Sequence, residues 1–225
     1  MNTPIGLCDD VAEDVVANII CIIDKSGSMG SVRSDTIGSF NVFVEEQKQM
    51  PGKANLTVVF FNHEMEVWYS GKLENVPELT TENYVPDGMT ALFDAICNTV
   101  DEMKTLKSAL LVILTDGEEN ASKKYKDKDR VKTMVEDREK GGWTVVYLGA
   151  NQDSFSEGVS MGVSGANTMN FMATSSGMIG AFRGISSTTT SYRTSQYNNS
   201  ANYPIVISTT ADNTYTPTIT TVGNI

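Results

Sequence analysis

The sequence predicts a doubly wound α/β domain, with a mostly parallel sheet, helices on both faces and one strand that pairs antiparallel in a hairpin. Apolar runs rich in β-branched residues, such as 15–24 and 109–115, are typical of strands that are buried on both faces. Segments with apolar residues at helical spacing alternate with these runs. Such alternation indicates a parallel sheet that helices cover on both sides.

The helical segments show one apolar face each. In the first of them, Ile37, Phe40 and Val44 fall on the same face, and Pro51-Gly52 follows as a stop signal. We expect these helices to pack on the sheet through their apolar faces. They are predicted at 36–50, 91–103 and 129–140, with a shorter helix near 152–158.

The remaining strands include the hairpin. Two strand-like runs, 56–61 and 65–69, are separated only by Asn62-His63-Glu64, which is typical of a hairpin turn. Further strands are predicted at 143–148 and, as a short one, near 167–171.

The chain of 225 residues is long enough for one domain with an ordinary core. We expect 1–14 to be an N-terminal leader and 15–184 to be the α/β domain. The segment 185–225 is rich in Ser, Thr, Asn and Tyr, with only Arg193 and Asp212 charged. Two structures are open for this C-terminal arm: a flexible tail, or an extended arm that adds strands to a neighbouring protein. The low charge favours the arm, because disordered segments usually carry more charge.

Charge argues against nucleic acid as a partner. The net charge is −11, whereas phosphate binding depends on clustered Lys and Arg. The one basic cluster, 123–132, is interleaved with Asp127 and Asp129, so we interpret it as a solvated surface.

Cysteine use and hydropathy bear on the compartment. Three cysteines, Cys8, Cys21 and Cys97, are too few for a disulfide framework and indicate a reducing compartment, or an assembly made in one. The sequence shows neither a signal peptide nor a run long enough to span a bilayer. We therefore expect no membrane partner and no export by a signal peptide.

A group of oxygen-bearing side chains directly follows the first predicted strand. Asp24, Ser26 and Ser28 alternate along one tight turn. Their carboxylate and hydroxyl oxygens are hard ligands that suit Mg²⁺ or Mn²⁺ rather than zinc. Open α/β sheets place ligand sites at the carboxyl ends of strands. The same residues are also favoured helix N-caps, so this turn alone leaves both interpretations open.

Two other segments add to this turn. Thr90 lies in a loop before the helix predicted at 91–103, and Asp116 ends the strand predicted at 109–115. Together, the Asp-x-Ser-x-Ser turn, the loop threonine and the strand-terminal Thr-Asp-Gly resemble the metal-ion-dependent adhesion site of the von Willebrand factor A domain family. All five ligand positions of that site have a counterpart here. They are Asp24, Ser26, Ser28, Thr90 and Asp116.

The resemblance covers roughly 15–183 and looks closest to small single-domain members from bacteria and their tailed phages. Four stretches carry this closer likeness. They are Asn41-Val-Phe-Val-Glu-Glu-Gln-Lys, Tyr84-Val-Pro-Asp-Gly-Met-Thr-Ala-Leu-Phe-Asp-Ala-Ile, Leu114-Thr-Asp-Gly-Glu-Glu-Asn and Tyr147-Leu-Gly-Ala-Asn.

The resemblance implies a site for Mg²⁺, or for Mn²⁺ or Ca²⁺. Ser26 and Ser28 would bind the ion directly, Thr90 would join them when the site is occupied, and Asp24 and Asp116 would act largely through coordinated waters. It also implies divalent-metal-dependent protein binding, in which the partner offers an Asp or Glu carboxylate to the ion. Two settings are open: a virion component, whose arm docks on a capsid or tail protein, or a cytoplasmic bacterial adaptor in a larger complex. The uncharged arm favours the virion.

Enzyme activity is the alternative from another class. A Mg²⁺ site can serve hydrolysis or phosphoryl transfer, but the sequence has no Gly-x-x-x-x-Gly-Lys phosphate loop. His63 is the only histidine and lies in the predicted hairpin turn, which argues against most histidine-dependent catalytic sites. We therefore expect a binding module and not an enzyme, with a metal-dependent hydrolase as the less supported interpretation.

Three further acidic residues lie near the predicted site. We interpret Glu118 and Glu119 as the solvated rim of the loop after Asp116. Asp94 is placed on the first turn of a helix, where the helix dipole favours an acid. It is also a candidate partner for Thr90.

Overall fold

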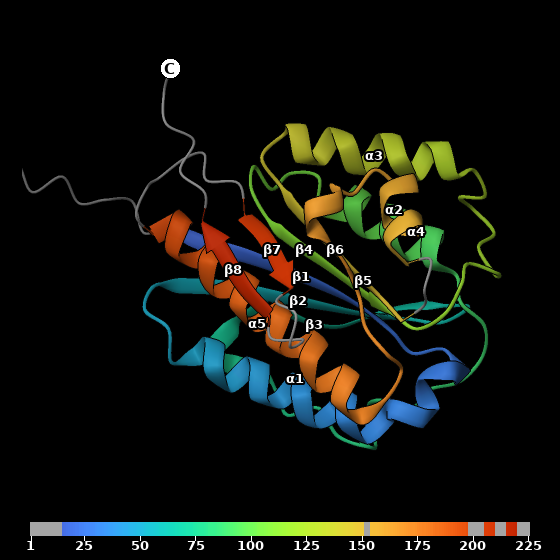
Figure 1. Cartoon of the computed structure of the whole chain (residues 1–225), viewed down its shortest axis with the longest axis horizontal. Coiled ribbons are helices and arrows are strands. Elements are labelled where there is room, and N and C mark those ends of the chain that lie inside the picture. Colours follow the sequence, from blue (N-terminus) through green and yellow to red (C-terminus); the bar gives the residue numbers. More distant parts are fainter. Residues whose placement is uncertain (1–14, 151–153, 198–204, 210–214, 220–225) are drawn as a thin grey trace, which may run out of the picture.

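The computed structural model describes residues 15–150, 154–197, 205–209 and 215–219, and the statements below concern these residues. The predicted leader, 1–14, lies outside them. A six-stranded sheet in the order β3-β2-β1-β4-β5-β6 forms the centre of the molecule (Figure 1). All neighbouring strands are parallel except β2 and β3, which pair antiparallel. The predicted α/β fold with one antiparallel hairpin strand is confirmed. The strands are β1 (Val16–Asp24), β2 (Lys53–Phe61), β3 (Met65–Lys72), β4 (Leu110–Thr115), β5 (Thr144–Gly149) and β6 (Thr168–Asn170).

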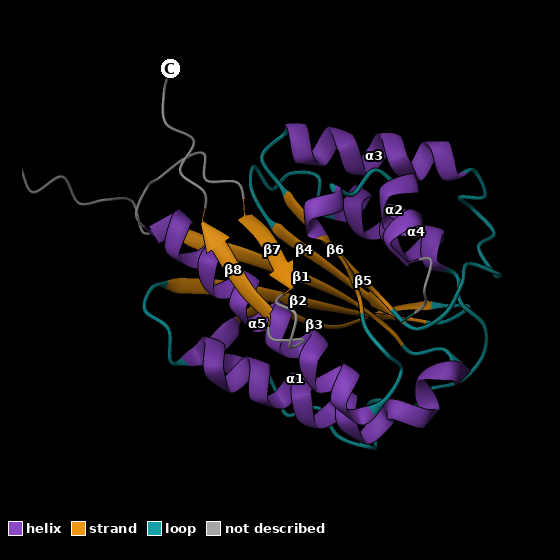
Figure 2. Cartoon of the chain, in the orientation of Figure 1, coloured by secondary structure: helices purple, strands orange, loops and turns teal. Residues whose placement is uncertain are grey.

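Helices cover both faces of this sheet (Figure 2). α1 (Arg33–Lys48) and α5 (Ser175–Tyr197) lie on one face, and α2 (Leu92–Glu102), α3 (Lys128–Lys140) and α4 (Ser154–Ser160) lie on the other. Short 3-10 turns lie at Gly27–Val32, Leu73–Asn75 and Gly165–Asn167.

The two faces have separate apolar cores, and β1 contributes to both. Ile19, Cys21 and Ile23 belong to the core under α1 and α5, whereas Ile20 and Ile22 belong to the core under α2 and α3. Alternate residues of a strand point to opposite faces of a sheet. The continuous apolar run of β1 is therefore explained by burial on both sides.

The boundary expected between 184 and 185 is corrected by the structure. α5 runs through it without a break, and Ile185, Tyr192 and Arg193 are buried. The hydroxyls of this segment bond within the helix, as Ser191 does to the carbonyl of Ser187 at 3.1 Å. A Ser- and Thr-rich composition is thus compatible with a packed helix, and the packed domain extends to Tyr197.

Two short strands follow α5 in the chain. β7 (Ile205–Thr209) and β8 (Tyr215–Ile219) pair antiparallel as a sheet of their own, and this hairpin lies against α5 (Figure 1). In these two ranges the C-terminal segment is therefore extended, and its strands pair with each other.

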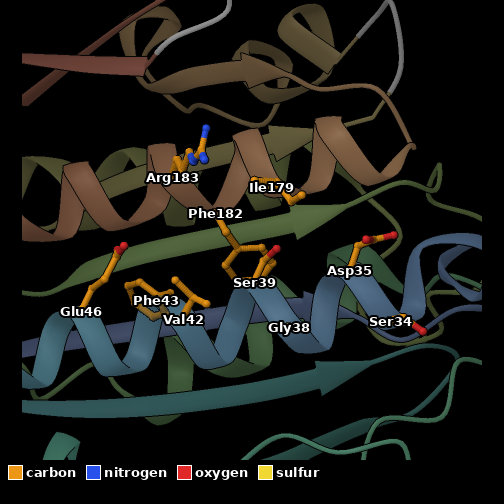
Figure 3. Close-up of a pocket in the computed structure, with 10 residues that line it drawn as sticks. All are labelled: Ser34, Asp35, Gly38, Ser39, Val42, Phe43, Glu46, Ile179, Phe182 and Arg183. Carbon is orange, nitrogen blue, oxygen red and sulfur yellow. The ribbon is translucent and has the colours of Figure 1, made fainter.

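A groove of about 440 Å³ separates the outer sides of α1 and α5 (Figure 3). Phe43 and Phe182 approach each other across it, with ring centroids 6.5 Å apart. Its rim carries the exposed side chains of Val42 and Ile179. The groove is mixed in polarity, because Asp35 and Glu46 also line it.

Other expectations concern thiols and membranes. Cys21 and Cys97 are buried free thiols, as expected for small core residues, and Cys8 lies outside the described residues. Within the described ranges, no helix is both long and apolar enough to cross a bilayer.

Candidate metal site

The candidate site lies where the strand order reverses. From β1 the chain continues outward through β2 and β3, and then returns to β4 on the other side of β1. Asp24 is the last residue of β1, and Asp116 directly follows β4. The carboxyl ends of two such strands border the crevice in which open α/β sheets bind ligands.

The turn after β1 links its side chains to Asp116. The backbone N–H of Ser26 donates to Asp24 Oδ1 at 2.6 Å, and the hydroxyls of Ser26 and Ser28 lie 3.0 Å apart. The Ser28 hydroxyl donates to Asp116 Oδ1 at 2.6 Å. The helix-cap interpretation is not supported, because Ser26 makes no side-chain capping bond and α1 begins after Val32.

Thr90 reaches the same place from the loop before α2. Its side chain is buried, and the missing side chain of Gly117 leaves space beside it. A Cβ atom on Gly117 would lie 2.7 Å from Thr90 Oγ1 and 3.5 Å from Asp24 Oδ2. The structure therefore brings all five predicted side chains together. It also gives a reason for glycine in the Thr-Asp-Gly sequence.

The two carboxylates of the site carry uncompensated charge. The pKa of Asp24 is raised to about 6, mainly because its side chain is buried. The charge of Asp116 also raises this pKa, whereas hydrogen bonds from Thr115 and Ser26 lower it. Burial also raises the pKa of Asp116. The described residues show no ion pair to either carboxylate, and the neighbouring Lys25 binds Glu66 at 2.9 Å instead.

The donor set fits a hard divalent cation. It consists of two carboxylates and three hydroxyls, without a sulfur or imidazole ligand. Mg²⁺, Mn²⁺ and Ca²⁺ prefer such oxygen ligands, and Mg²⁺ usually keeps several of its waters. A side chain at position 117 would collide with the Thr90 hydroxyl, so glycine lets Thr90 and Asp24 come close to the Asp116 loop.

His63 lies closer to the site than its sequence position indicates. It is exposed in the β2–β3 turn, as expected, but its ring packs on Gly88 of the Thr90 loop. A Cβ on Gly88 would meet His63 Nδ1 at 2.3 Å, and Gly88 has a φ of +75°. The carbonyl of Gly88 in turn accepts a hydrogen bond from Gly27 N–H at 3.0 Å.

The acidic residues around the site divide into two groups. Glu118 is exposed, as expected for a rim residue. Glu119 instead accepts hydrogen bonds from the N–H groups of Phe93, Ala121 and Ser122, so its interpretation as a solvated residue is wrong. The residues that make these bonds follow no periodic pattern in the sequence, which is why sequence analysis missed the bonds.

Comparison of the sequence with known proteins finds no matching family model and no matching curated protein. Comparison of the structure does find matches. One is to a von Willebrand factor type A protein from Catenulispora acidiphila, with a TM-score of 0.59 and 18% identity over 77% of this chain and 42% of that chain. The chain has the von Willebrand factor A fold.

Two other solved structures share this von Willebrand factor A fold. The ArnB paralog VWA2 from Sulfolobus acidocaldarius matches with a TM-score of 0.54 and 17% identity over 71% of this chain and 42% of that chain. Proximal thread matrix protein 1 from the mussel byssus, whose metal-ion-dependent adhesion site motif holds zinc, matches with a TM-score of 0.55 and 14% identity over 77% of this chain and 48% of that chain. The chain spans less than half the length of each of these proteins.

Proposed function

We propose that this domain binds a protein partner through a divalent cation held at the site. One observation carries the proposal: the buried Asp24 and the half-buried Asp116, both without a cationic partner among the described residues, converge with three hydroxyls at the carboxyl edge of a von Willebrand factor A fold. Ser26, Ser28 and Thr90 would hold the ion directly. Asp24 and Asp116 would hold its waters.

When bound, the ion supplies a coordination position that a carboxylate oxygen of the partner fills. The residues of this chain keep that position open, because their hydroxyl oxygens are neutral and leave the ion partly uncompensated. Gly117 lets the Thr90 hydroxyl approach the loop after β4, and the buried Asp24 fixes the turn through the N–H of Ser26. In this proposal the partner therefore supplies the carboxylate of an Asp or a Glu. The loops around the site select which partner binds.

The proposed ion is Mg²⁺, or Mn²⁺ or Ca²⁺, and the proposed role is binding without catalysis. The zinc in the mussel byssus protein supports divalent binding by this fold. Among the described residues, His63 is the only imidazole, and it packs on Gly88. A metal-dependent hydrolase would instead turn over phosphate esters, and the turnover would be lost in Asp24→Ala.

The biological setting is proposed from composition. The hairpin formed by β7 and β8 belongs to a segment with few charges, which would suit docking on a capsid or tail protein of a virion. A cytoplasmic adaptor of a bacterial complex is the other setting. Neither setting involves nucleic acid or a membrane in this proposal, because the chain has a net charge of −11.

Partner binding is tested by affinity capture from the source lysate or particle, with Mg²⁺ in one arm and EDTA in the other. We expect mass spectrometry to identify a partner that is retained only with the metal. Equal retention in EDTA would contradict binding through the ion and would assign the interaction to another surface, such as the β7–β8 hairpin.

Divalent metal is expected to stabilise the folded domain. The free energy of unfolding should rise by about 2.7 kcal/mol when the free ion is at a hundredfold its dissociation constant, because the ion binds the folded chain alone. Thermal unfolding with Mg²⁺, Mn²⁺ and Ca²⁺ up to millimolar concentrations measures this. An unchanged melting temperature with all three ions would argue against a preformed site.

Stability without metal is expected to depend on pH through Asp24. Its pKa of about 6 in the folded chain lies above the ordinary value of 3.8, so the folded state retains the proton longer than the unfolded chain does. The free energy of unfolding should therefore fall as the pH rises from about 4 to 6, by about 3 kcal/mol for this group alone. Denaturant unfolding in EDTA at several pH values measures the fall.

Asp24→Asn is the matched control for this pH dependence, because the amide does not ionise. The variant should lose most of the fall in stability between pH 4 and 6. Metal affinity should show the opposite trend and strengthen with pH, because the proton on Asp24 must leave before the carboxylate can hold the waters of the ion. Parallel pH curves for the two proteins would rule out Asp24 as the source.

A further inference from the structure

Thr90, one of the five site residues, is held in place by a residue outside the site. Its backbone N–H donates to Asn120 Oδ1 at 2.9 Å, and its carbonyl accepts from Asn120 N–H at 3.0 Å. The N–H of Ala121 adds a further bond to the same carbonyl at 3.1 Å. Both peptide groups of Thr90 are therefore fixed by the loop that follows Asp116.

This loop is itself fixed to helix α2 by Glu119. The carboxylate accepts from the N–H of Phe93 at 2.9 Å, and from the N–H and hydroxyl of Ser122 at 2.8 and 2.7 Å. The first N–H groups of a helix have no partner within the helix. Ala91, at the N-cap of α2, supplies no side-chain bond, so Glu119 takes over this capping role from a neighbouring loop.

Asp94 fixes the far end of the same loop from the first turn of α2. Its carboxylate accepts from the N–H groups of Lys123, Lys124 and Tyr125 at 2.7, 3.0 and 2.7 Å. Although partial burial opposes it, these N–H groups lower the pKa of Asp94. Asp94 is thus a partner of the loop backbone and not of Thr90 itself.

We propose that Asn120 is a positioning residue for metal binding, with Glu119 and Asp94 holding the loop that carries it. This inference rests on the proposed function. In it, Thr90 and Asp116 belong to one preformed unit before the ion binds, because Asn120 ties their two loops together. Preformed ligands lose less conformational freedom on binding, and loss of such outer partners typically weakens metal affinity about 10- to 100-fold.

The test compares the Mg²⁺ affinity of the full chain with that of Asn120→Ala, by titration calorimetry. We expect the affinity of the variant to fall about 10- to 100-fold. The melting temperature without metal should change little, because Asn120 is exposed. Asn120→Asp keeps the acceptor for Thr90 N–H and should restore most of the affinity, which a merely structural role would not predict.

Asn98→Ala is the matched control. Asn98 also joins α2 to this loop, by accepting from Lys124 Nζ at 2.8 Å, but it does not touch Thr90. The Mg²⁺ affinity of Asn98→Ala should equal that of the wild type. Equal losses in Asn98→Ala and Asn120→Ala would show general loosening of the loop and would overturn the inference.

The remaining outcomes separate the inference from the proposed function. If the wild type binds Mg²⁺ and Asn120→Ala binds it equally well, the positioning role is wrong and the metal site stands. If the wild type binds neither Mg²⁺ nor Mn²⁺ nor Ca²⁺, both the proposed function and the inference that rests on it are wrong. If Asn120→Ala does not fold, Glu119→Gln replaces it, and an affinity equal to that of the wild type then counts against the inference.

Discussion

Replacing Asp116 by alanine is expected to abolish metal-dependent partner binding while the domain stays folded. The carboxylate accepts the Ser28 hydroxyl and shares the charge of the site with Asp24. Without it, the ion loses one of two anionic groups, and the Ser28 hydroxyl loses its acceptor. Capture of the partner with Mg²⁺ should therefore fall to the level seen in EDTA.

The folded state of Asp116→Ala should be at least as stable as that of the wild type without metal. Burial raises the pKa of this carboxyl, so its ionised form is held in an unfavourable environment that the variant removes. Asp137→Ala is the matched control, because Asp137 is an exposed carboxylate on α3 that pairs with Lys140 rather than with a site residue. Normal partner binding by Asp116→Ala would contradict partner binding through the metal ion.

Arg193→Ala is expected to produce a large loss of stability, although this residue lies outside the site. Arg193 is buried, with 4% of its surface exposed. Its guanidinium donates to the carbonyls of Gln47 and Gly52, the latter at 2.9 Å, and so binds the C-terminal end of α1. Removal leaves the carbonyl of the buried Gln47 without this donor and leaves a cavity, which should cost about 3 to 5 kcal/mol of unfolding free energy.

Urea unfolding measures this loss, with Arg183→Ala as the control. Arg183 lies on the same helix but is exposed at the groove between α1 and α5 (Figure 3), so its removal should change stability by less than about 0.5 kcal/mol. Deleting 186–225 should for the same reason unfold the domain, because the deletion removes Arg193 and the second half of α5. Similar stability of the two arginine variants would contradict a role of Arg193 in joining the helices.

The parts of the fold that follow periodic patterns could be predicted from the sequence. β1, for example, was predicted at 15–24 and spans Val16–Asp24, because burial on both faces leaves a continuous apolar run. α5 was predicted to end too early. Its buried positions after Ile185 are mostly Ser and Thr, and their hydroxyls bond to the helix carbonyls, so burial leaves no apolar trace.

The residues of the site were predicted from the sequence, but the residues that hold them in place were not. Asp24, Ser26 and Ser28 share one turn, so their closeness follows from the sequence alone. Thr90 and Asp116 were assigned to the same site only through the family resemblance, because sequence spacing does not show which strands are neighbours in the sheet. Glu119 and Asn120 were missed, because their partners are backbone N–H and carbonyl groups that any residue would offer.

The central pairing of β1 with β4 also has a consequence for the growing chain on the ribosome. Asp24 and Thr115, which are joined by a hydrogen bond at 2.6 Å, are 91 positions apart in the sequence. At about 5–20 residues per second, β1 waits roughly 5 to 20 seconds after its own synthesis before β4 emerges. During that time β2 can pair with one edge of β1 and β3 with β2, while the other edge of β1 stays open to association with other nascent chains.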